Sequence, residues 1–211
     1  MHFFPLIADL FLHLDVHLAD VILHYGVWTY ALLFVIVFCE TGLVVTPFLP
    51  GDSLLFAGGS LAALGALHPV TLAGTFVLGA FLGDITNYAI GRFLGERLFR
   101  GNSWFFKREN LDKTHLFYEK HGSKALIMAR FVPIIRTFAP FVAGIGRMRY
   151  LRFLSFSILA SLLWVTVCVG AGFMFGNIPV VKKNFSLVIL GIVAVSFLPV
   201  AIGAWRSRSR E

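Results

Sequence analysis

Residues 40–58 decide how the rest of the chain is interpreted, and they read Glu-Thr-Gly-Leu-Val-Val-Thr-Pro-Phe-Leu-Pro-Gly-Asp-Ser-Leu-Leu-Phe-Ala-Gly. The run places two carboxylates, Glu40 and Asp52, and two prolines, Pro47 and Pro50, inside an apolar sequence. Proline removes a backbone donor and clashes with the preceding turn, so it breaks or kinks a helix. Acids in hydrocarbon are expensive and tend to mark ion, proton or substrate pathways. The stretch therefore predicts a broken helix or re-entrant hairpin that lines a polar cavity.

The composition outside this stretch is that of an integral membrane protein. Of 211 residues, 58% are hydrophobic and 14% are charged, with a mean hydropathy of +0.83. Soluble domains have about 45–50% apolar and about 25% charged residues. The net charge of +7 comes from Lys and Arg at the edges of apolar spans, which indicates membrane topology and not a nucleic-acid partner.

The N-terminal segment, residues 1–25, predicts an amphipathic helix that lies on the membrane. Its polar residues recur at helical steps, and a solvated helix face explains them better than a metal site does. We therefore predict no metal and no cofactor. The polar face consists of Asp9, His13, His17, Asp20 and His24.

A single membrane domain is expected over residues 26–205, with four spanning helices. Eight Lys or Arg residues lie between residues 92 and 124. We expect the polar segment 93–124 to be amphipathic and cytoplasmic because basic loops stay inside. The basic tail, residues 206–211, predicts a cytoplasmic C-terminus, and counting spans backwards places the N-terminus on the same side. The four predicted spans are 26–45, 70–91, 153–176 and 185–204.

A second irregular segment, residues 125–146, contains Arg130, Pro133, Arg136 and Pro140 within apolar sequence. Basic clusters flank it on both sides, so it is expected to enter the membrane and return without crossing. The first hairpin, residues 46–66, is expected to enter from the opposite face.

The two hairpins share a sequence pattern, which predicts an inverted-topology repeat. Pro-x2-Pro-x6-Ala-Gly in the first hairpin matches Pro-x2-Arg-x6-Ala-Gly in the second, 86 residues later. The first repeat would cover residues 26–92 and the second residues 125–205, although chance or shared hairpin geometry also accounts for so short a match. The predicted hairpin-forming residues are Pro47, Pro50, Gly51, Gly58, Pro133, Pro140 and Gly144.

The charges divide between the two repeats. The first supplies Glu40 and Asp52, and the second supplies Arg130 and Arg136. Two guanidinium groups near half-helix N-termini predict a phosphate site, and a nearby buried carboxylate can bind a proton and so weaken its pairing with arginine. The alternative is that the four residues only neutralise one another and hold the hairpins together.

A third polar patch comprises Asp84, Asn87 and Tyr88, which share one helical face in the predicted span 70–91. These residues are predicted to line the transport pathway. Helix packing around a satisfied aspartate is the competing interpretation.

Three blocks of this sequence resemble the DedA family: Glu40-x-Gly42-x4-Pro47-x2-Pro50-Gly51-Asp52, Gly83-Asp84-x3-Tyr88-x2-Gly91-Arg92 and Arg130-Phe131-x-Pro133-x2-Arg136-x6-Ala143-Gly144. The resemblance implies an inner-membrane protein with paired re-entrant hairpins, a fold shared with lipid scramblases of the VTT-domain group. It also implies a role in returning undecaprenyl phosphate across the bilayer. Functional acids of the family fall on Glu40 and Asp52, and functional arginines on Arg130 and Arg136.

We therefore expect an all-α polytopic transporter of the bacterial inner membrane that moves a polyprenyl phosphate lipid between leaflets with proton coupling. Motifs of soluble enzymes are absent from the sequence, so no enzyme activity is expected. One alternative is a proton-coupled antiporter of ions or small cations, and a second is a membrane scaffold without transport. The sequence leaves open whether the chain forms a homo-oligomer.

Overall fold

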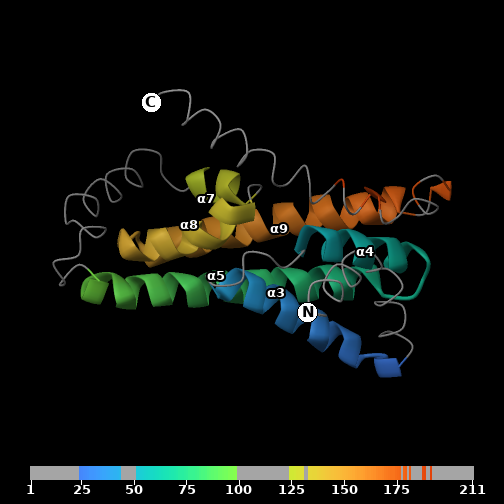
Figure 1. The fold of residues 1–211 in the computed structure, drawn as a ribbon, viewed down its shortest axis with the longest axis horizontal. Helices are drawn as coiled ribbons and strands as arrows, with labels where there is room; N and C mark the ends of the chain where they lie inside the picture. Colours follow the sequence, from blue (N-terminus) through green and yellow to red (C-terminus); the bar gives the residue numbers. More distant parts are fainter. Residues whose placement is uncertain are drawn as a thin grey trace, which may run out of the picture. The chain divides into compact units, whose positions relative to one another are not determined.

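The computed structural model describes residues 24–43, 51–98, 124–130 and 133–176, together with a few positions between 178 and 191. Every regular element in these ranges is a helix, as predicted (Figure 1). The helices are α3 (Trp28–Gly42), α4 (Gly51–Ala63), α5 (Pro69–Leu98), α7 (Lys124–Ala129), α8 (Pro133–Ile145) and α9 (Tyr150–Phe175).

Several predictions concern residues outside these ranges. They are the amphipathic helix up to residue 23, the hairpin prolines Pro47 and Pro50, most of the basic segment 93–124, nearly all of the fourth span 185–204, and the tail 206–211. The positions of the two chain ends relative to the membrane therefore stay predictions.

Two helices have the length and composition to cross a membrane, namely Pro69–Leu94 within α5 and Tyr150–Phe175, which is α9. Each has 26 residues, and at about 1.5 Å per residue such a helix exceeds the roughly 30 Å of hydrocarbon in a bilayer. Only 33% of the apolar window in either helix is buried, so most of its side chains face outward, unlike the core helix of a soluble protein. Two of the four predicted spans are therefore present with full length in the described residues.

The other elements differ in length from the prediction. Helix α3 is apolar but has 15 residues, which gives about 22 Å and leaves this part short of a complete crossing. Helix α5 runs on to Leu98, past the end of the span predicted at residue 91. Gly91 does not end α5 because it serves helix packing, as described below.

The first predicted hairpin contains α4, a buried helix too short to span the membrane. Its 13 residues give about 20 Å of length, and nearly all of them are buried. The helix ends in a Schellman motif, in which Ala66 N–H donates to Leu61 O and Gly65 N–H donates to Ala62 O. Gly65 has φ +81°, which glycine adopts without strain, and the chain then turns directly into α5.

The second predicted hairpin consists of α7 and α8, which pack against each other (Figure 1). Pro133 occupies the first position of α8, where a missing N–H does no harm. Helix α8 ends in the same motif as α4, because Met148 N–H donates to Ala143 O and Arg147 N–H to Gly144 O. Here Arg147 takes the left-handed conformation, with φ 51°.

The described residues form two compact units, and each unit contains one hairpin helix with a part of both long helices. The first unit comprises α4, the beginning of α5 and the end of α9, with the beginning of α3. The second comprises α7, α8, the end of α5 and the beginning of α9, with the end of α3.

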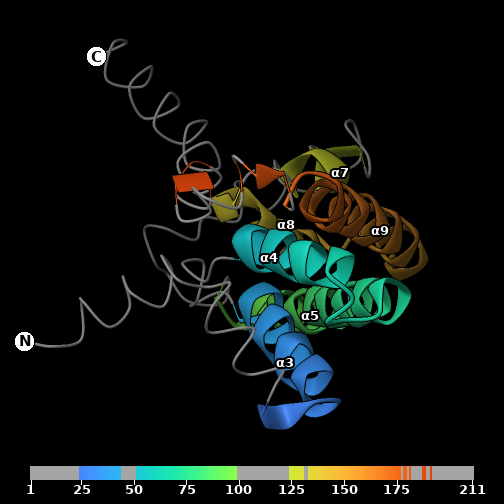
Figure 2. The same ribbon diagram turned by 90° about the vertical axis from the view of Figure 1, so that its right-hand side faces the viewer.

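Close backbone contact through glycine holds each hairpin helix on a long helix. In the first unit, a Cβ at Gly59 of α4 would clash with the backbone of Val169, and one at Gly172 of α9 would clash with Phe56 O. A Cβ at the neighbouring Gly58 would meet Leu72 and Phe76 of α5, so α4 also runs beside the first part of α5 (Figure 2). Small residues permit such close approach of membrane helices.

The second unit repeats this contact with different residues. A Cβ at Gly144 of α8 would clash with Tyr88 O, and one at Gly91 of α5 would clash with Phe141 O. The Phe-x2-Gly pair of α8 thus makes the same contacts as the Phe-x2-Gly pair of α4. Gly144 is equivalent to Gly59, 85 positions earlier, so the sequence match at 86 residues is one residue out of structural register.

Candidate functional site

The first element of the candidate site is the ion pair between Glu40 and Arg136. Glu40 lies in the last turn of α3 and is 0% exposed, whereas Arg136 lies in the first turn of α8 and is also buried. The Arg136 guanidinium donates to a Glu40 carboxylate oxygen through Nη2. An acid at a helix C-terminus and a cation at a helix N-terminus are each unfavourable, so pairing offsets both penalties.

The second element joins Arg130, Asp84 and Ser157. Arg130 follows α7 at the break in the hairpin, Asp84 lies in α5, and Ser157 lies in α9. Arg130 Nη1 donates to Asp84 Oδ2, and Ser157 Oγ donates to the same oxygen at 2.6 Å. All three side chains are buried, so this cluster fixes the hairpin break against both long helices of its unit.

Asn87 lies one turn after Asp84 and connects the surroundings of the two ion pairs. Its Nδ2 donates to Thr41 O at 3.0 Å and to Thr137 O at 2.6 Å. Thr41 adjoins Glu40, and Thr137 adjoins Arg136. The side-chain amide of Asn87 therefore bonds the backbone next to both residues of the Glu40–Arg136 ion pair. Asn87 is fully buried, and its contacts are those of a residue that ties segments together.

Tyr88 is part of the packed interior of the second unit. Its hydroxyl donates to Met148 O at 2.5 Å and accepts from Arg92 Nη1 at 3.2 Å. Its ring stacks on Phe153, with ring centroids 4.3 Å apart. The contacts of Asn87 and Tyr88 favour the packing interpretation, and the pathway-lining role stays a prediction.

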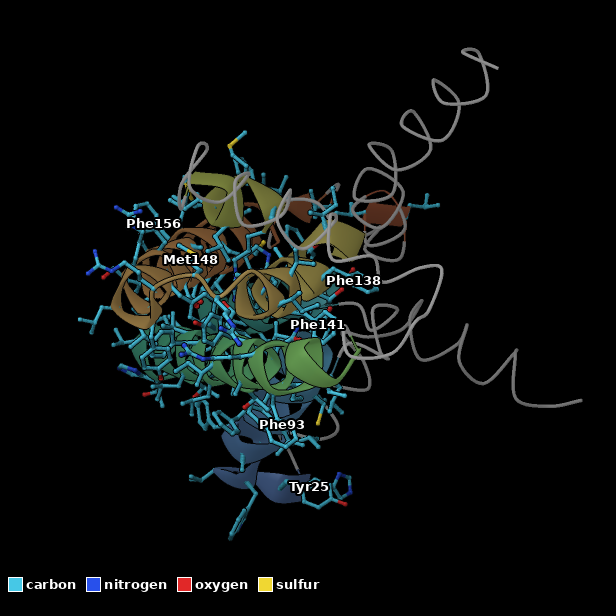
Figure 3. All side chains as sticks on the ribbon, turned by 90° about the vertical axis from the view of Figure 1, so that its left-hand side faces the viewer. Tyr25, Phe93, Phe138, Phe141, Met148 and Phe156 are labelled. Carbon is cyan, nitrogen blue, oxygen red and sulfur yellow. The ribbon has the colours of Figure 1, made fainter. Side chains whose placement is uncertain are left out.

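Figure 3 labels other side chains of the same unit. Met148 is buried, whereas Phe93 of α5 and Phe138 of α8 are exposed apolar side chains.

Asp52 belongs to the first unit, where it occupies the first turn of α4. A carboxylate is favourable there because the N-terminal end of a helix carries partial positive charge. Trp164 of α9 donates from Nε1 to Asp52 Oδ1 at 2.8 Å. The two predicted acids therefore have different surroundings, since Glu40 is bonded to a guanidinium and Asp52 to a neutral indole.

The structure thus brings together four of the predicted polar residues in the second unit: Glu40, Asp84, Arg130 and Arg136. Two carboxylates and two guanidinium groups make a site without net charge. Guanidinium groups bind phosphate oxygens as well as carboxylates, so the paired arginines are also of the residue type found in anion sites. No group of three or more metal-ligating side chains occurs within the described ranges.

Sequence reasoning missed Ser157 and Trp164. Ser157 stands among apolar residues of α9, and a lone serine in a membrane helix gives no sign of its partner. In sequence, Trp164 looks like one more lipid-facing aromatic residue. Its position was a signal against that interpretation, because it lies in the middle of α9 and not at a span end.

These observations define the class of protein. It is an all-helical membrane protein with buried arginine–carboxylate pairs where its helices are broken. Residues 49–174 match the VTT domain. The chain is 56% identical to Protein DedA of Escherichia coli (strain K12) over 196 residues, which cover 92% of this chain and 90% of that protein. The chain belongs to the DedA family.

More distant relatives indicate the compartment. Inner membrane protein YghB of Salmonella typhimurium is 35% identical over 82% of this chain and 78% of that protein. Inner membrane protein YqjA of Escherichia coli (strain K12) is 38% identical over 73% of this chain and 70% of that protein. No solved structure matches the chain. The protein is therefore an inner-membrane protein of the DedA family.

Proposed function

We propose that this protein is a transporter that moves a phosphorylated lipid carrier between the leaflets of the inner membrane, with proton coupling. The observation that carries the proposal is the pair of buried arginines, Arg130 and Arg136, each held by a carboxylate within one compact unit. Charged groups inside membrane proteins mark substrate and proton pathways.

The arginines are the phosphate ligands in this proposal. A guanidinium group is always charged and presents a planar fork that matches two oxygens of a phosphate. Asp84 and Glu40 each accept a hydrogen bond from these guanidinium groups, Asp84 from Arg130 and Glu40 from Arg136. A headgroup that enters the site replaces a carboxylate, and the carboxylate returns when the headgroup leaves.

Protons act on the carboxylates. Proton binding removes the charge of Glu40 or Asp84 and so weakens its attraction to the paired arginine. Each proton therefore favours phosphate binding, which links proton and lipid movement. Asp52 serves the same proton function in the other unit, where its carboxylate lies at the start of α4.

The apolar outer faces of the long helices and the family resemblance support the proposed lipid class. Exposed Leu, Val and Phe side chains on α5 and α9 are compatible with acyl or prenyl chains that remain in the bilayer while the headgroup crosses. A polyprenyl phosphate, undecaprenyl phosphate in a bacterial membrane, is the proposed substrate.

The two alternatives make different demands on the same residues. A cation antiporter needs acids without adjacent cations, and two paired arginines count against it. A scaffold without transport needs only the ion pairs, and both pairs are complete in this structure. The variants that separate the scaffold from the transporter are described in the Discussion.

Leaflet-resolved labelling in proteoliposomes tests the proposal. Vesicles that contain the purified protein are expected to move polyprenyl monophosphate at least about tenfold faster than protein-free vesicles, the factor that corresponds to a barrier lowered by about 1.4 kcal/mol. The polyprenol of the same length without phosphate is not expected to move faster than in protein-free vesicles. Equal rates for the phosphate lipid with and without protein would reject the proposal, and proton flux driven by cations alone would support the antiporter.

A further inference from the structure

The proposed function does not use the hydrogen bond between Trp164 and Asp52. Its two residues are far apart in sequence and belong to the same compact unit. Trp164 is 1% exposed, and Asp52 is partly buried at the start of α4. The Nε1–Oδ1 distance of 2.8 Å is that of a well-formed hydrogen bond.

Trp164 does not have the position of an interfacial anchor. Tryptophan at a membrane surface lies near the end of a span with its N–H toward water. Trp164 lies in the middle of α9 and is enclosed by protein, whereas Trp28 is 76% exposed. A buried indole N–H is costly unless it is bonded, so its orientation toward Asp52 is a specific feature of the packing.

The helices that carry the two residues are held at a fixed separation. Backbone contact through Gly59 and Gly172 presses α4 against α9 within the same unit. An added methyl group would force these backbones apart. The close packing therefore fixes the distance between Trp164 and the first turn of α4. Asp52 is therefore bonded to a side chain that has little freedom to move.

We infer that Trp164 is the positioning residue of Asp52, and that its Nε1–H fixes the carboxylate in the orientation in which Asp52 takes part in transport. This inference rests on the proposed function for the role of Asp52. Trp164 touches neither phosphate nor proton in this account. It acts through Asp52 by holding one oxygen of its carboxylate.

The transport test uses two replacements of Trp164 that remove the N–H. Trp164→Phe is the genetic variant, and benzothienylalanine at the same position keeps the bicyclic shape while replacing N–H by sulfur. Both are expected to lower the maximal rate of polyprenyl monophosphate translocation by about tenfold, the worth of one hydrogen bond to a charged group, with KM within about twofold of wild type. Trp28→Phe is the matched control and is expected to leave both constants unchanged.

Wild-type rates in both Trp164 variants would overturn the inference, because an aromatic ring without the N–H would then suffice. A parallel rise in KM with an unchanged maximal rate would also overturn it, since Trp164 would then belong to lipid binding. Benzothienylalanine keeps a bicyclic ring at position 164. If Trp164→Phe alone failed to fold, the benzothienylalanine variant would still test whether the N–H is needed.

A fluorescence test decides the hydrogen bond without any transport. In the full-length protein with Trp28, Trp104 and Trp205 replaced by phenylalanine, Trp164 is the remaining tryptophan. Asp52→Ala is expected to shift its emission to shorter wavelength, because the indole loses a polar partner, whereas Ser53→Ala is not. An unchanged emission in Asp52→Ala would reject the bond. If the wild-type protein moved no phosphate lipid, the proposed function would fail while this result still stood.

Discussion

Replacing Arg136 with methionine is expected to destabilise the protein by about 3–5 kcal/mol and to abolish translocation of phosphorylated lipid. The stability effect arises because Glu40, which is fully buried, loses the guanidinium to which it is bonded. Thermal or denaturant unfolding in detergent measures the first effect, and the proteoliposome assay measures the second. Arg149→Met, which removes an exposed arginine, is the control and is expected to change stability by less than about 0.5 kcal/mol.

The double variant Glu40→Leu with Arg136→Met separates structure from transport. Replacement of a complete buried ion pair by apolar residues of similar volume is often neutral or stabilising, so the double variant is expected to recover most of the lost stability. Translocation is not expected to return, because a phosphate ligand is missing. A double variant that is stable and fully active would show that the pair has only a structural role and would favour the scaffold.

Gly172→Ala is expected to destabilise the first unit by about 1–3 kcal/mol, the usual penalty for overpacking a tight interface. The added Cβ would collide with Phe56 O, which belongs to a helix backbone and cannot rotate away as a flexible side chain would. The two helices would have to separate, and that movement would also disturb Gly59 against Val169.

Gly170→Ala is the matched control for this prediction. The control position lies two residues earlier in α9, and a Cβ there meets nothing within 4 Å. Alanine is the better helix former, so this variant is expected to be neutral or more stable by up to about 1 kcal/mol. Equal unfolding temperatures for the two variants would contradict the account of close backbone packing.

The broken helices could be predicted because their signal is local. Pro133 and the polar residues near it interrupt an apolar run, and α7 and α8 separate at that point. The buried arginines could be predicted for the same reason, since a guanidinium in an apolar segment must be satisfied within the protein. The pairing of Glu40 with Arg136 agrees with the predicted division of charge between the two halves.

The partners of the other charges could not be predicted. Asp84 pairs with Arg130, and Trp164 bonds Asp52, because helices from distant parts of the sequence meet there. No spacing rule within one segment encodes such a contact. The one-residue error in the repeat has a similar cause: the sequence match aligned Gly58 with Gly144, whereas the backbone contacts make Gly59 the equivalent position.

In the proposed function, carboxylate and phosphate compete for Arg136, and the affinity of the purified Glu40→Gln variant for polyprenyl monophosphate tests that claim. Removal of the competing charge is expected to tighten binding by at least about tenfold, equivalent to about 1.4 kcal/mol, while Arg136→Met weakens it by a similar factor. A Glu40→Gln variant that binds the phosphate lipid no more tightly than the wild-type protein would contradict the claim.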